Sequence, residues 1–278
     1  MDLYCVMGNP VAHSKSPWIH ARFAELTGQT LHYGKRHIPL DGFDAAVHSF
    51  AAEGGLGCNV TLPFKFEAAA LATQISQRAL LAQAANTLSF KDDQILADNS
   101  DGAGLVNDIK QGAGLALQGC HLLLIGAGGA AAGVLAPLLL AQPASITVVN
   151  RTLAKASILV ARHAALALLQ STELLAHDLQ GLKGQFDVVI NASASSLSGA
   201  GVPVAGSTLK PSALAYDLMY GSAAQGFMTW AGEHGAVARD GLGMLVEQAA
   251  ESFLIWRGVR PPAQQVLAEL RTEMSCRT

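Results

Sequence analysis

A lysine at the start of a predicted helix is the first residue whose position suggests chemistry. The run Asn59-Val60-Thr61-Leu62-Pro63-Phe64-Lys65 places polar side chains at the carboxyl end of a strand and Lys65 just inside the helix that Pro63 opens. Cations are disfavoured at the positive end of a helix dipole, so this ammonium is suited to giving up a proton. Taken alone, the run fits an exposed lysine without a role better.

Two hydroxyls precede another predicted helix. In Ser14-Lys15-Ser16-Pro17, Ser16 is expected to be the N-cap and Pro17 the first helical residue. The hydroxyls and the free N–H groups of the helix could together bind a small carboxylate. Simple capping explains the serines equally well.

A polar run supplies a carboxylate that could orient the lysine. Asp98-Asn99-Ser100-Asp101-Gly102 resembles part of a calcium loop, but Ala97 and Asp108 stand where the first ligand and the last glutamate should be. We therefore expect no metal, and we expect Asp101, in a loop, to pair with Lys65. Asn86 could donate to and accept from a polyol, or merely end a helix.

A glycine-rich turn follows an apolar strand. Leu122–Ile125 runs into Gly126-Ala127-Gly128-Gly129-Ala130, which fits G-x-G-x-x-G/A between strand and helix. Such glycines let backbone N–H groups approach a pyrophosphate at a helix N-terminus. A close-packed turn without a ligand is the alternative.

The end of the next strand distinguishes between dinucleotides. An NAD site usually has Asp or Glu there, whereas this chain has Asn150-Arg151-Thr152, with Lys155 one turn later. Cations at this point suit the extra phosphate of NADP. The pattern favours NADP over a solvated strand end.

The elements expected to position these residues form two successive runs of alternating strands and helices. Strands are expected at 3–7, 31–38, 57–61, 86–90 and 94–97, and then at 121–125, 145–149, 186–190 and 214–217. Helices are expected at 16–28, 43–52, 63–70, 129–141, 154–167, 223–233, 242–256 and 262–274. The alternation predicts an α/β fold with mainly parallel sheets covered on both faces, in two lobes.

The composition limits the class of protein. Lys plus Arg number 18 and Asp plus Glu 21 among 278 residues, so no basic surface for nucleic acid or an anionic membrane is indicated. The uncharged stretch 122–141 is long enough to cross a bilayer, but its glycines and Pro137 favour a buried strand, turn and helix. Four scattered cysteines and no signal peptide predict a cytoplasmic protein with reduced thiols.

Seven motifs occur in an order that resembles the shikimate dehydrogenase family over nearly the whole chain. They are Met7-Gly8-Asn9-Pro10 with His13–Pro17, Asn59-Val60-Thr61 with Pro63-Phe64-Lys65, Ala85-Asn86-Thr87, Asp98–Gly102, Gly126–Ala130, Asn150-Arg151-Thr152 and Asp240-Gly241-Leu242-Gly243-Met244. The resemblance implies reversible NADPH-dependent reduction of 3-dehydroshikimate to shikimate, in chorismate and aromatic amino-acid biosynthesis.

The resemblance also implies roles for residues. Lys65 and Asp101 would be catalytic, and the substrate would contact Ser14, Ser16, Asn59, Thr61, Asn86, Tyr220 and Gln248. NADP would contact Gly126, Ala127, Gly128, Gly129, Ala130, Asn150, Arg151, Thr152, Lys155, Met219, Gly241 and Met244. The substrate domain would comprise 1–101 and 239–278, with terminal helices returning to it, and a Rossmann-type NADP domain would comprise 102–238. A monomer or a homodimer is expected.

The chain departs from the family pattern at three places. Ala131-Ala132 replaces the Ser/Thr-Arg that often follows the glycine turn, Asn191-Ala192-Ser193-Ala194-Ser195 replaces the usual Asn-Ala-Thr loop, and Ser100 replaces Thr. Two alternatives stay open. One is a quinate/shikimate dehydrogenase with broader substrate or cofactor use, and the other is an NADP sensor without activity.

Overall fold

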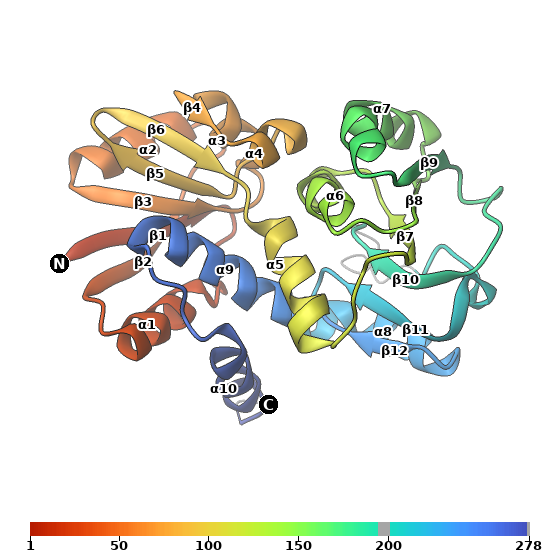
Figure 1. Cartoon of the computed structure of the whole chain (residues 1–278). Coiled ribbons are helices and arrows are strands. Elements are labelled where there is room, and N and C mark those ends of the chain that lie inside the picture. Colours follow the sequence, from red (N-terminus) through yellow and green to blue (C-terminus); the bar gives the residue numbers. More distant parts are fainter. Residues whose placement is uncertain (194–200, 277–278) are drawn as a thin grey trace. The chain divides into compact units, whose positions relative to one another are not determined.

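The computed structural model describes residues 1–193 and 201–276, which divide into two compact units (Figure 1). Unit 1 comprises 1–104 and 245–278, and unit 2 comprises 105–244. The chain passes between the units inside two helices, α5 (Asp101–Asn107) and α9 (Leu242–Arg257). The boundaries expected at 101 and 239 fall a few residues before these points.

Unit 1 contains a mixed sheet in the order β2-β1-β3-β5-β6-β4. Its strands are β1 (Asp2–Gly8), β2 (Leu31–His37), β3 (Gly55–Val60), β4 (Gln74–Ile75), β5 (Thr87–Lys91) and β6 (Gln94–Asp98). Its helices are α1 (Ser16–Thr27), α2 (Phe43–Ala52), α3 (Lys65–Leu71), α4 (Gln77–Ala82) and α10 (Ala263–Ser275), with the greater part of α9. Strand β5 pairs antiparallel with β6, as the predicted hairpin requires, and it also pairs antiparallel with β3.

Alternate residues of β1 bury opposite faces of this sheet. Cys5 and Met7 pack with the apolar residues of α2 and α3, whereas Tyr4 and Val6 face the other layer. On that second face Trp256 of α9 stacks on Tyr4, with ring centroids 4.7 Å apart. Burial on both faces explains why the strand is an unbroken apolar run.

The C-terminal helices pack in unit 1, which confirms their predicted return. Arg22 of α1 donates from Nε and Nη2 to both carboxylate oxygens of Glu269 in α10, at 2.6 and 3.0 Å. A two-point pair of this kind fixes orientation as well as distance. Periodicity along the chain could not reveal it, because the two residues are 247 positions apart.

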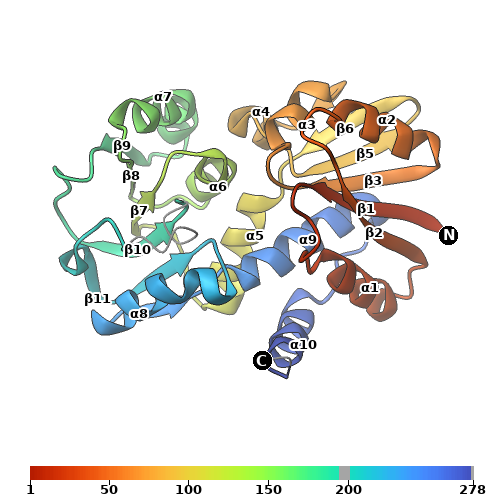
Figure 2. The ribbon, with the colours of Figure 1, turned by 180° about the vertical axis from the view of Figure 1, so that it is seen from behind.

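Unit 2 contains an all-parallel sheet in the order β12-β11-β10-β7-β8-β9. Its strands are β7 (His121–Ile125), β8 (Ser145–Val149), β9 (Glu173–His177), β10 (Phe186–Asn191), β11 (Leu209–Asp217) and β12 (Val237–Arg239). Its helices are α6 (Gly129–Leu140), α7 (Leu153–Leu169) and α8 (Gln225–Glu233), and a π-helical turn at Asp108–Gly112 continues α5. Figure 2 shows α8 lying along β11 and β12.

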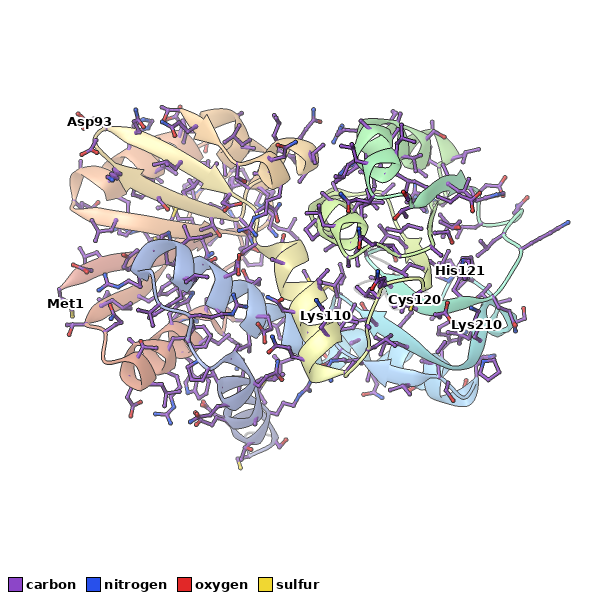
Figure 3. All side chains as sticks on the ribbon, in the orientation of Figure 1. Met1, Asp93, Lys110, Cys120, His121 and Lys210 are labelled. Atoms are coloured by element: carbon purple, nitrogen blue, oxygen red, sulfur yellow. The ribbon has the colours of Figure 1, made fainter. Side chains whose placement is uncertain are left out.

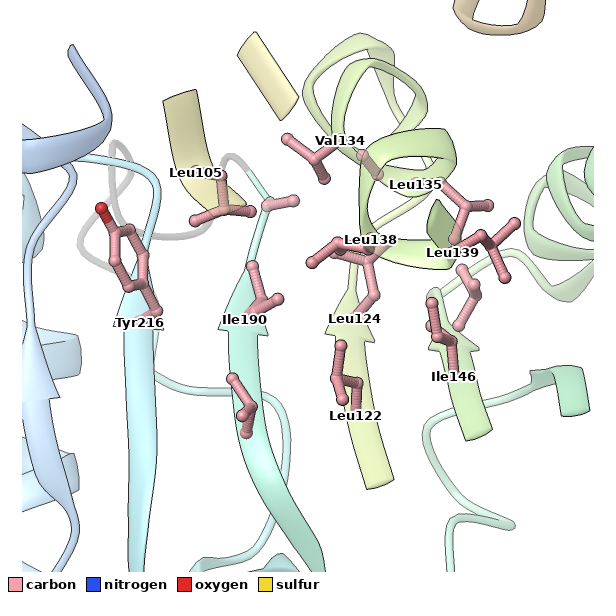
Figure 4. Close-up of a cluster of buried hydrophobic side chains, with 14 of the residues drawn as sticks. Leu105, Leu122, Leu124, Val134, Leu135, Leu138, Leu139, Ile146, Ile190 and Tyr216 are labelled. Carbon is pink, nitrogen blue, oxygen red and sulfur yellow. The ribbon is translucent and has the colours of Figure 1, made fainter. Parts of the chain in front are cut away.

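The central strand of unit 2 is buried on both sides. Leu122 and Leu124 pack against α6, as Figure 4 shows, whereas Leu123 and Ile125 belong to the cluster beneath α8. The apolar stretch 122–141 is therefore a buried strand, a turn and a helix, as predicted. No helix in the described part of the chain is long and apolar enough to span a membrane.

Among the strands and α-helices of the described residues, five were not predicted. They are β4, α4, α5, β9 and β12. Gly102 and Gly104 argue against a helix, yet α5 forms because Leu105 and the following Ile109 are fully buried in unit 2. The missed strands are two to five residues long, too short for periodicity to reveal them, and all three lie at sheet edges.

All four cysteines are unpaired.

Candidate active site

Lys65 and Asp101 meet in unit 1, as predicted. Lys65 is the first residue of α3, and its Nζ lies 2.5 Å from Asp101 Oδ2. The Asp101 side chain is 9% exposed and that of Lys65 22%, so the ammonium is the more accessible partner. Asp101 is the first residue of α5 and does not lie in the predicted loop. The pair has the arrangement of a proton donor held by a carboxylate.

Asn86 fixes the other oxygen of Asp101. Its Nδ2 donates to Asp101 Oδ1 at 2.8 Å and to Ser100 Oγ at 3.0 Å, and its Oδ1 accepts from the Ser100 N–H at 2.8 Å. Gln248 Oε1 accepts further bonds from Asn86 and Ser100, at 3.3 and 3.4 Å. The amide of Asn86 is thus engaged by the protein itself, and it positions Asp101. These four residues form one buried cluster.

A second amide continues this cluster. Asn59 Nδ2 donates to the Asn86 carbonyl at 3.0 Å and to Ser252 Oγ at 2.9 Å, and Asn59 Oδ1 accepts from the Tyr33 hydroxyl at 2.7 Å. Burial raises the pKa of Tyr33. A chain of hydrogen bonds therefore runs from Tyr33 through Asn59 to the cluster around Asp101.

The two serines lie together, but the predicted cap is wrong. Lys15 is the N-cap of α1, without a side-chain bond, and Ser16 is already helical. Ser14 Oγ accepts from the Ser16 N–H at 3.3 Å and donates to Ser16 Oγ at 3.2 Å. Ser14 therefore does the capping, because its side chain reaches the first free amide. Both hydroxyls stay at the helix N-terminus, where an anion is favoured.

Thr61 lies directly after β3, on the segment that leads to Lys65. Its N–H donates to the Met7 carbonyl at 2.9 Å, and its carbonyl accepts from Phe64 N at 3.1 Å. A Cβ on Gly8 would lie 2.3 Å from Thr61 Cγ2, so only glycine fits beside it. The two backbone hydrogen bonds hold Thr61 between β1 and α3.

The predicted cofactor residues of unit 2 follow the carboxyl ends of its parallel strands. The glycine turn follows β7, Asn150–Lys155 follows β8, Met219 follows β11, and Gly241–Met244 follows β12. Ligands bind at this edge in doubly wound sheets. Cys120 and His121, labelled in Figure 3, lie at the opposite, amino-terminal edge.

The glycine turn fits a pyrophosphate. Gly126 has φ +111°, and a Cβ there would lie 2.9 Å from the Ala192 carbonyl oxygen. Gly128 is the N-cap of α6 with no side-chain cap, and nothing lies within 4 Å of where its Cβ would be. The amides of Gly129 and Ala130 begin a helix of 12 residues and have no intrahelical partner. Space beside uncapped amides is what a phosphate needs.

The structure explains why alanine stands at positions 131 and 132. Both are buried in the core cluster beneath α6, at 0% and 7% exposure. A serine or threonine followed by arginine would have to place a polar or charged side chain in this layer. The small side chains keep α6 close to the sheet, which leaves the phosphate site to backbone amides.

Exposed polar side chains follow β8. Arg151, Thr152 and Lys155 are exposed, and Asn150 Nδ2 donates to the Thr152 carbonyl at 2.9 Å. Thr152 is the N-cap of α7 without a side-chain bond. Two accessible cations near a helix N-terminus form a suitable surface for a phosphate.

Met219 and Gly241 are held together by a backbone hydrogen bond. The Gly241 N–H donates to the Met219 carbonyl at 2.8 Å, and a Cβ on Gly241 would lie 2.2 Å from the Leu218 carbonyl oxygen. Tyr220 is half-buried, and burial raises its pKa. Asn191 Oδ1 accepts from Ser193 Oγ at 2.7 Å, whereas Ala194 and Ser195 lie outside the described residues.

Sequence reasoning missed several partners of the site. Tyr33 and Ser252 carried no signal, because they act only through neighbours distant in the chain. Across the described ranges, no group of three or more His, Cys, Asp or Glu side chains could hold a metal ion.

Three protein-family models match separate segments of the chain. Residues 6–88 match the shikimate dehydrogenase substrate-binding domain, 108–199 match the shikimate/quinate 5-dehydrogenase model, and 241–271 match the shikimate 5′-dehydrogenase C-terminal domain. The first match contains Lys65 and Asn86, and the second contains the glycine turn.

Individual proteins are similar over almost the whole length. A shikimate dehydrogenase (NADP⁺) of Acidovorax sp. (strain JS42) is 67% identical over 274 residues, which cover 99% of this chain and 97% of that protein. An Ael1 enzyme from Pseudomonas putida has a TM-score of 0.90 at 44% identity, covering 97% of this chain and 98% of that chain. Shikimate 5-dehydrogenase of Thermus thermophilus, in complex with NADP(H) and shikimate, has a TM-score of 0.80 at 27% identity, covering 98% and 99%. Because sequence identity, domain models and fold agree along the chain, it belongs to the shikimate dehydrogenase family.

Proposed function

We propose that the chain catalyses the NADPH-dependent reduction of 3-dehydroshikimate to shikimate, and the reverse oxidation. The Lys65–Asp101 pair carries this proposal, because an accessible ammonium held by a buried carboxylate suits a ketone oxygen that must gain a proton. The relative from Acidovorax is a shikimate dehydrogenase (NADP⁺), which supports the same reaction. Unit 1 would be the substrate domain and unit 2 the NADP domain.

Each unit would contribute a different part of the reaction. NADPH, when bound, supplies the hydride that reduces the ketone carbon. Gly126–Ala130 would hold its pyrophosphate, and Arg151 and Lys155 its additional phosphate, with Asn150 and Thr152 beside them. Met219, Gly241 and Met244, on the same edge of the sheet, would contact its nicotinamide end.

Lys65 would act on the oxygen of the ketone. As the carbonyl carbon is reduced, negative charge builds on oxygen, and the Lys65 ammonium stabilises it and transfers one proton to it. The amine then regains a proton from solvent. Asp101 holds the ammonium in position, and Asn86 holds Asp101 by its second oxygen.

The remaining polar groups of unit 1 would bind the substrate around the reacting carbon. Ser14 and Ser16 would hold the carboxylate at the N-terminus of α1. Thr61, Asn59, Asn86 and Gln248 would surround the ring hydroxyls, with Tyr220 completing the carboxylate end. Asn59 is already engaged by Tyr33 and Ser252, so it would contribute mainly by positioning.

The reaction is tested by following NADPH absorbance with shikimate and NADP⁺. Formation of NADPH that depends on both compounds supports the proposal. No turnover, with NADP⁺ still bound, would favour a sensor that kept the fold. A parallel assay with quinate in place of shikimate distinguishes an enzyme with broader substrate use. The family model matched by 108–199 is described as shikimate/quinate 5-dehydrogenase, whereas the substrate-binding model matched by 6–88 names shikimate alone. We expect shikimate to be strongly preferred.

We also propose a reducing, cytoplasmic location and a monomer or homodimer. Four unpaired cysteines, two of them buried in unit 1, suit a reducing compartment.

All the proposed site residues come from one chain, so the chemistry requires no second copy. Size-exclusion chromatography across a concentration series distinguishes the two assemblies.

A further inference from the structure

Unit 2 contains a fully buried carboxylate that the proposed reaction does not use. Asp108 has 0% exposure and begins the π-helical turn that continues α5. Arg239 donates to it from Nε and Nη2, at 2.6 Å each, and the Tyr216 hydroxyl donates to Oδ2 at 2.7 Å. A buried charge is costly unless it is paired and hydrogen-bonded, and here both oxygens are satisfied.

Glycines allow backbone to approach this carboxylate closely. A Cβ on Gly243 would lie 2.2 Å from the Asp108 carboxylate, and a Cβ on Gly112 would lie 2.1 Å from Arg239 Nη2. Gly243 belongs to the first turn of α9. That turn therefore packs directly against Asp108, and any larger residue at position 243 would push it away.

Tyr216 connects the buried carboxylate to the same turn. Its hydroxyl accepts from the Met244 N–H at 3.1 Å while it donates to Asp108. Amides in the first turn of a helix have no intrahelical partner, so Tyr216 supplies the missing acceptor. Burial raises the pKa of Tyr216 well above its usual value, which keeps the hydroxyl protonated for its bond to Asp108. In Figure 4 the Tyr216 ring lies at the margin of the apolar cluster.

Gly241–Met244, the segment that contains this turn, lies at the ligand-binding edge of the sheet. It follows the carboxyl end of β12, and Gly241 is bonded to Met219, which follows β11. Met219 is fixed in turn, because its N–H donates to Asp217 Oδ1 at 2.9 Å. Several backbone groups at this edge are thus fastened to buried side chains that no ligand would touch.

We propose that Asp108, Tyr216 and Arg239 are positioning residues for hydride transfer. They hold Gly241–Met244 in the place that shapes the nicotinamide end of the cofactor site. The inference rests on the proposed function. Its physical basis is that hydride transfer is sensitive to misplacement of the donor by a fraction of an ångström, whereas binding of the rest of the dinucleotide is not.

Tyr216→Phe tests this proposal, because it removes one oxygen and keeps the ring in its core position. We expect kcat to fall about tenfold and the isotope effect from NADPH deuterated at the transferred hydrogen to rise, with Kd for NADPH changed less than about threefold. Asp108→Asn should likewise lower kcat and raise the isotope effect. If Asp108→Asn does not fold, Tyr216→Phe decides the question.

A matched control removes a buried hydroxyl elsewhere in unit 2. Thr172 Oγ1 donates to the Pro143 carbonyl at 2.8 Å, at the amino-terminal end of β9. Thr172→Val should lower Tm as Tyr216→Phe does, yet leave kcat and the isotope effect unchanged. Wild-type kcat and isotope effect in Tyr216→Phe, or equal losses in Thr172→Val, would overturn the positioning role. A wild-type protein without turnover would instead refute the proposed function.

Discussion

The two units prepare their ligand sites in different ways. In unit 1, hydrogen bonds link Tyr33 through Asn59 to Asn86 and Asp101, among the proposed catalytic and substrate residues. In unit 2, the glycine turn offers backbone amides, and the charged side chains beside it are exposed. Reacting groups need fixed geometry, whereas a phosphate needs amides and charge. Substitutions of the reacting groups of unit 1 should therefore reduce kcat, and those of the glycine turn and exposed cations of unit 2 should weaken the binding of NADP.

The sharpest test of this contrast is Lys65→Ala. We expect kcat to fall by about 10³, because the developing oxyanion loses its proton donor, while NADPH binding stays within about twofold of wild type. Stopped-flow kinetics and fluorescence titration measure the two quantities. Lys91→Ala, an exposed lysine of the β5–β6 hairpin, is the control and should match wild type. A near-normal kcat for Lys65→Ala would remove the catalytic role.

A buried imidazole makes unit 1 sensitive to acid. Burial lowers the pKa of His20 from 6.5 to about 3, and neither ring nitrogen has a hydrogen-bond partner among the described residues. The unfolded chain binds a proton below about pH 6.5 and the folded protein does not, so acidification favours unfolding between pH 6.5 and 3. We expect His20 to cost about 2 kcal/mol of unfolding free energy between about pH 7 and about pH 5.

His20→Leu isolates this contribution. Denaturant unfolding at about pH 7 and about pH 5 should show a smaller loss of stability in the variant, by about 2 kcal/mol. The comparison uses the difference between two pH values, so a change in overall stability does not affect it. Equal losses in variant and wild type would mean that the unprotonated imidazole is not the cause.

Arg151→Ala probes the exposed charges of unit 2. Loss of one charge-assisted contact to a phosphate should raise KM for NADP⁺ about tenfold, with little effect on KM for NAD⁺, which lacks that group. Steady-state kinetics with both cofactors give the ratio. Lys110→Ala, an exposed lysine of the π-helical turn, serves as the control. Equal changes for both cofactors would refute the phosphate assignment.

Gly128→Ala has the smallest expected effect, and it distinguishes an effect on ligand binding from an effect on the stability of the fold. The new methyl would meet no protein atom within 4 Å, so Tm should stay the same. A pyrophosphate approaching the turn would meet it, and we expect KM for NADP⁺ to rise several-fold. Gly126→Ala is the contrast, because φ +111° and the Ala192 carbonyl make it destabilising without any ligand. Unchanged KM in Gly128→Ala would argue for a turn that binds nothing.

The sequence predicted the central strands and most helices, because burial on two faces leaves unbroken apolar runs and helices leave capping signals. It missed β9 and α5, for different reasons. The edge strand β9 has only one neighbour among the described strands and a mixed pattern. Helix α5 contains two glycines and exists because its apolar side chains pack in a core assembled from distant segments.

Residue types and order by themselves determined that a lysine begins a helix after a polar strand end, that a glycine turn joins an apolar strand to a helix, and that cations follow the next strand. Such features depend on neighbours along the chain, which is why they can be recognised there. Only the tertiary structure decided that Asn86 holds Asp101, that Tyr33 and Ser252 hold Asn59, and that Tyr216 joins Asp108 to Met244. These bonds join residues 15 to 193 positions apart, and side chains with such separations meet only when packing of the core brings their strands and helices together.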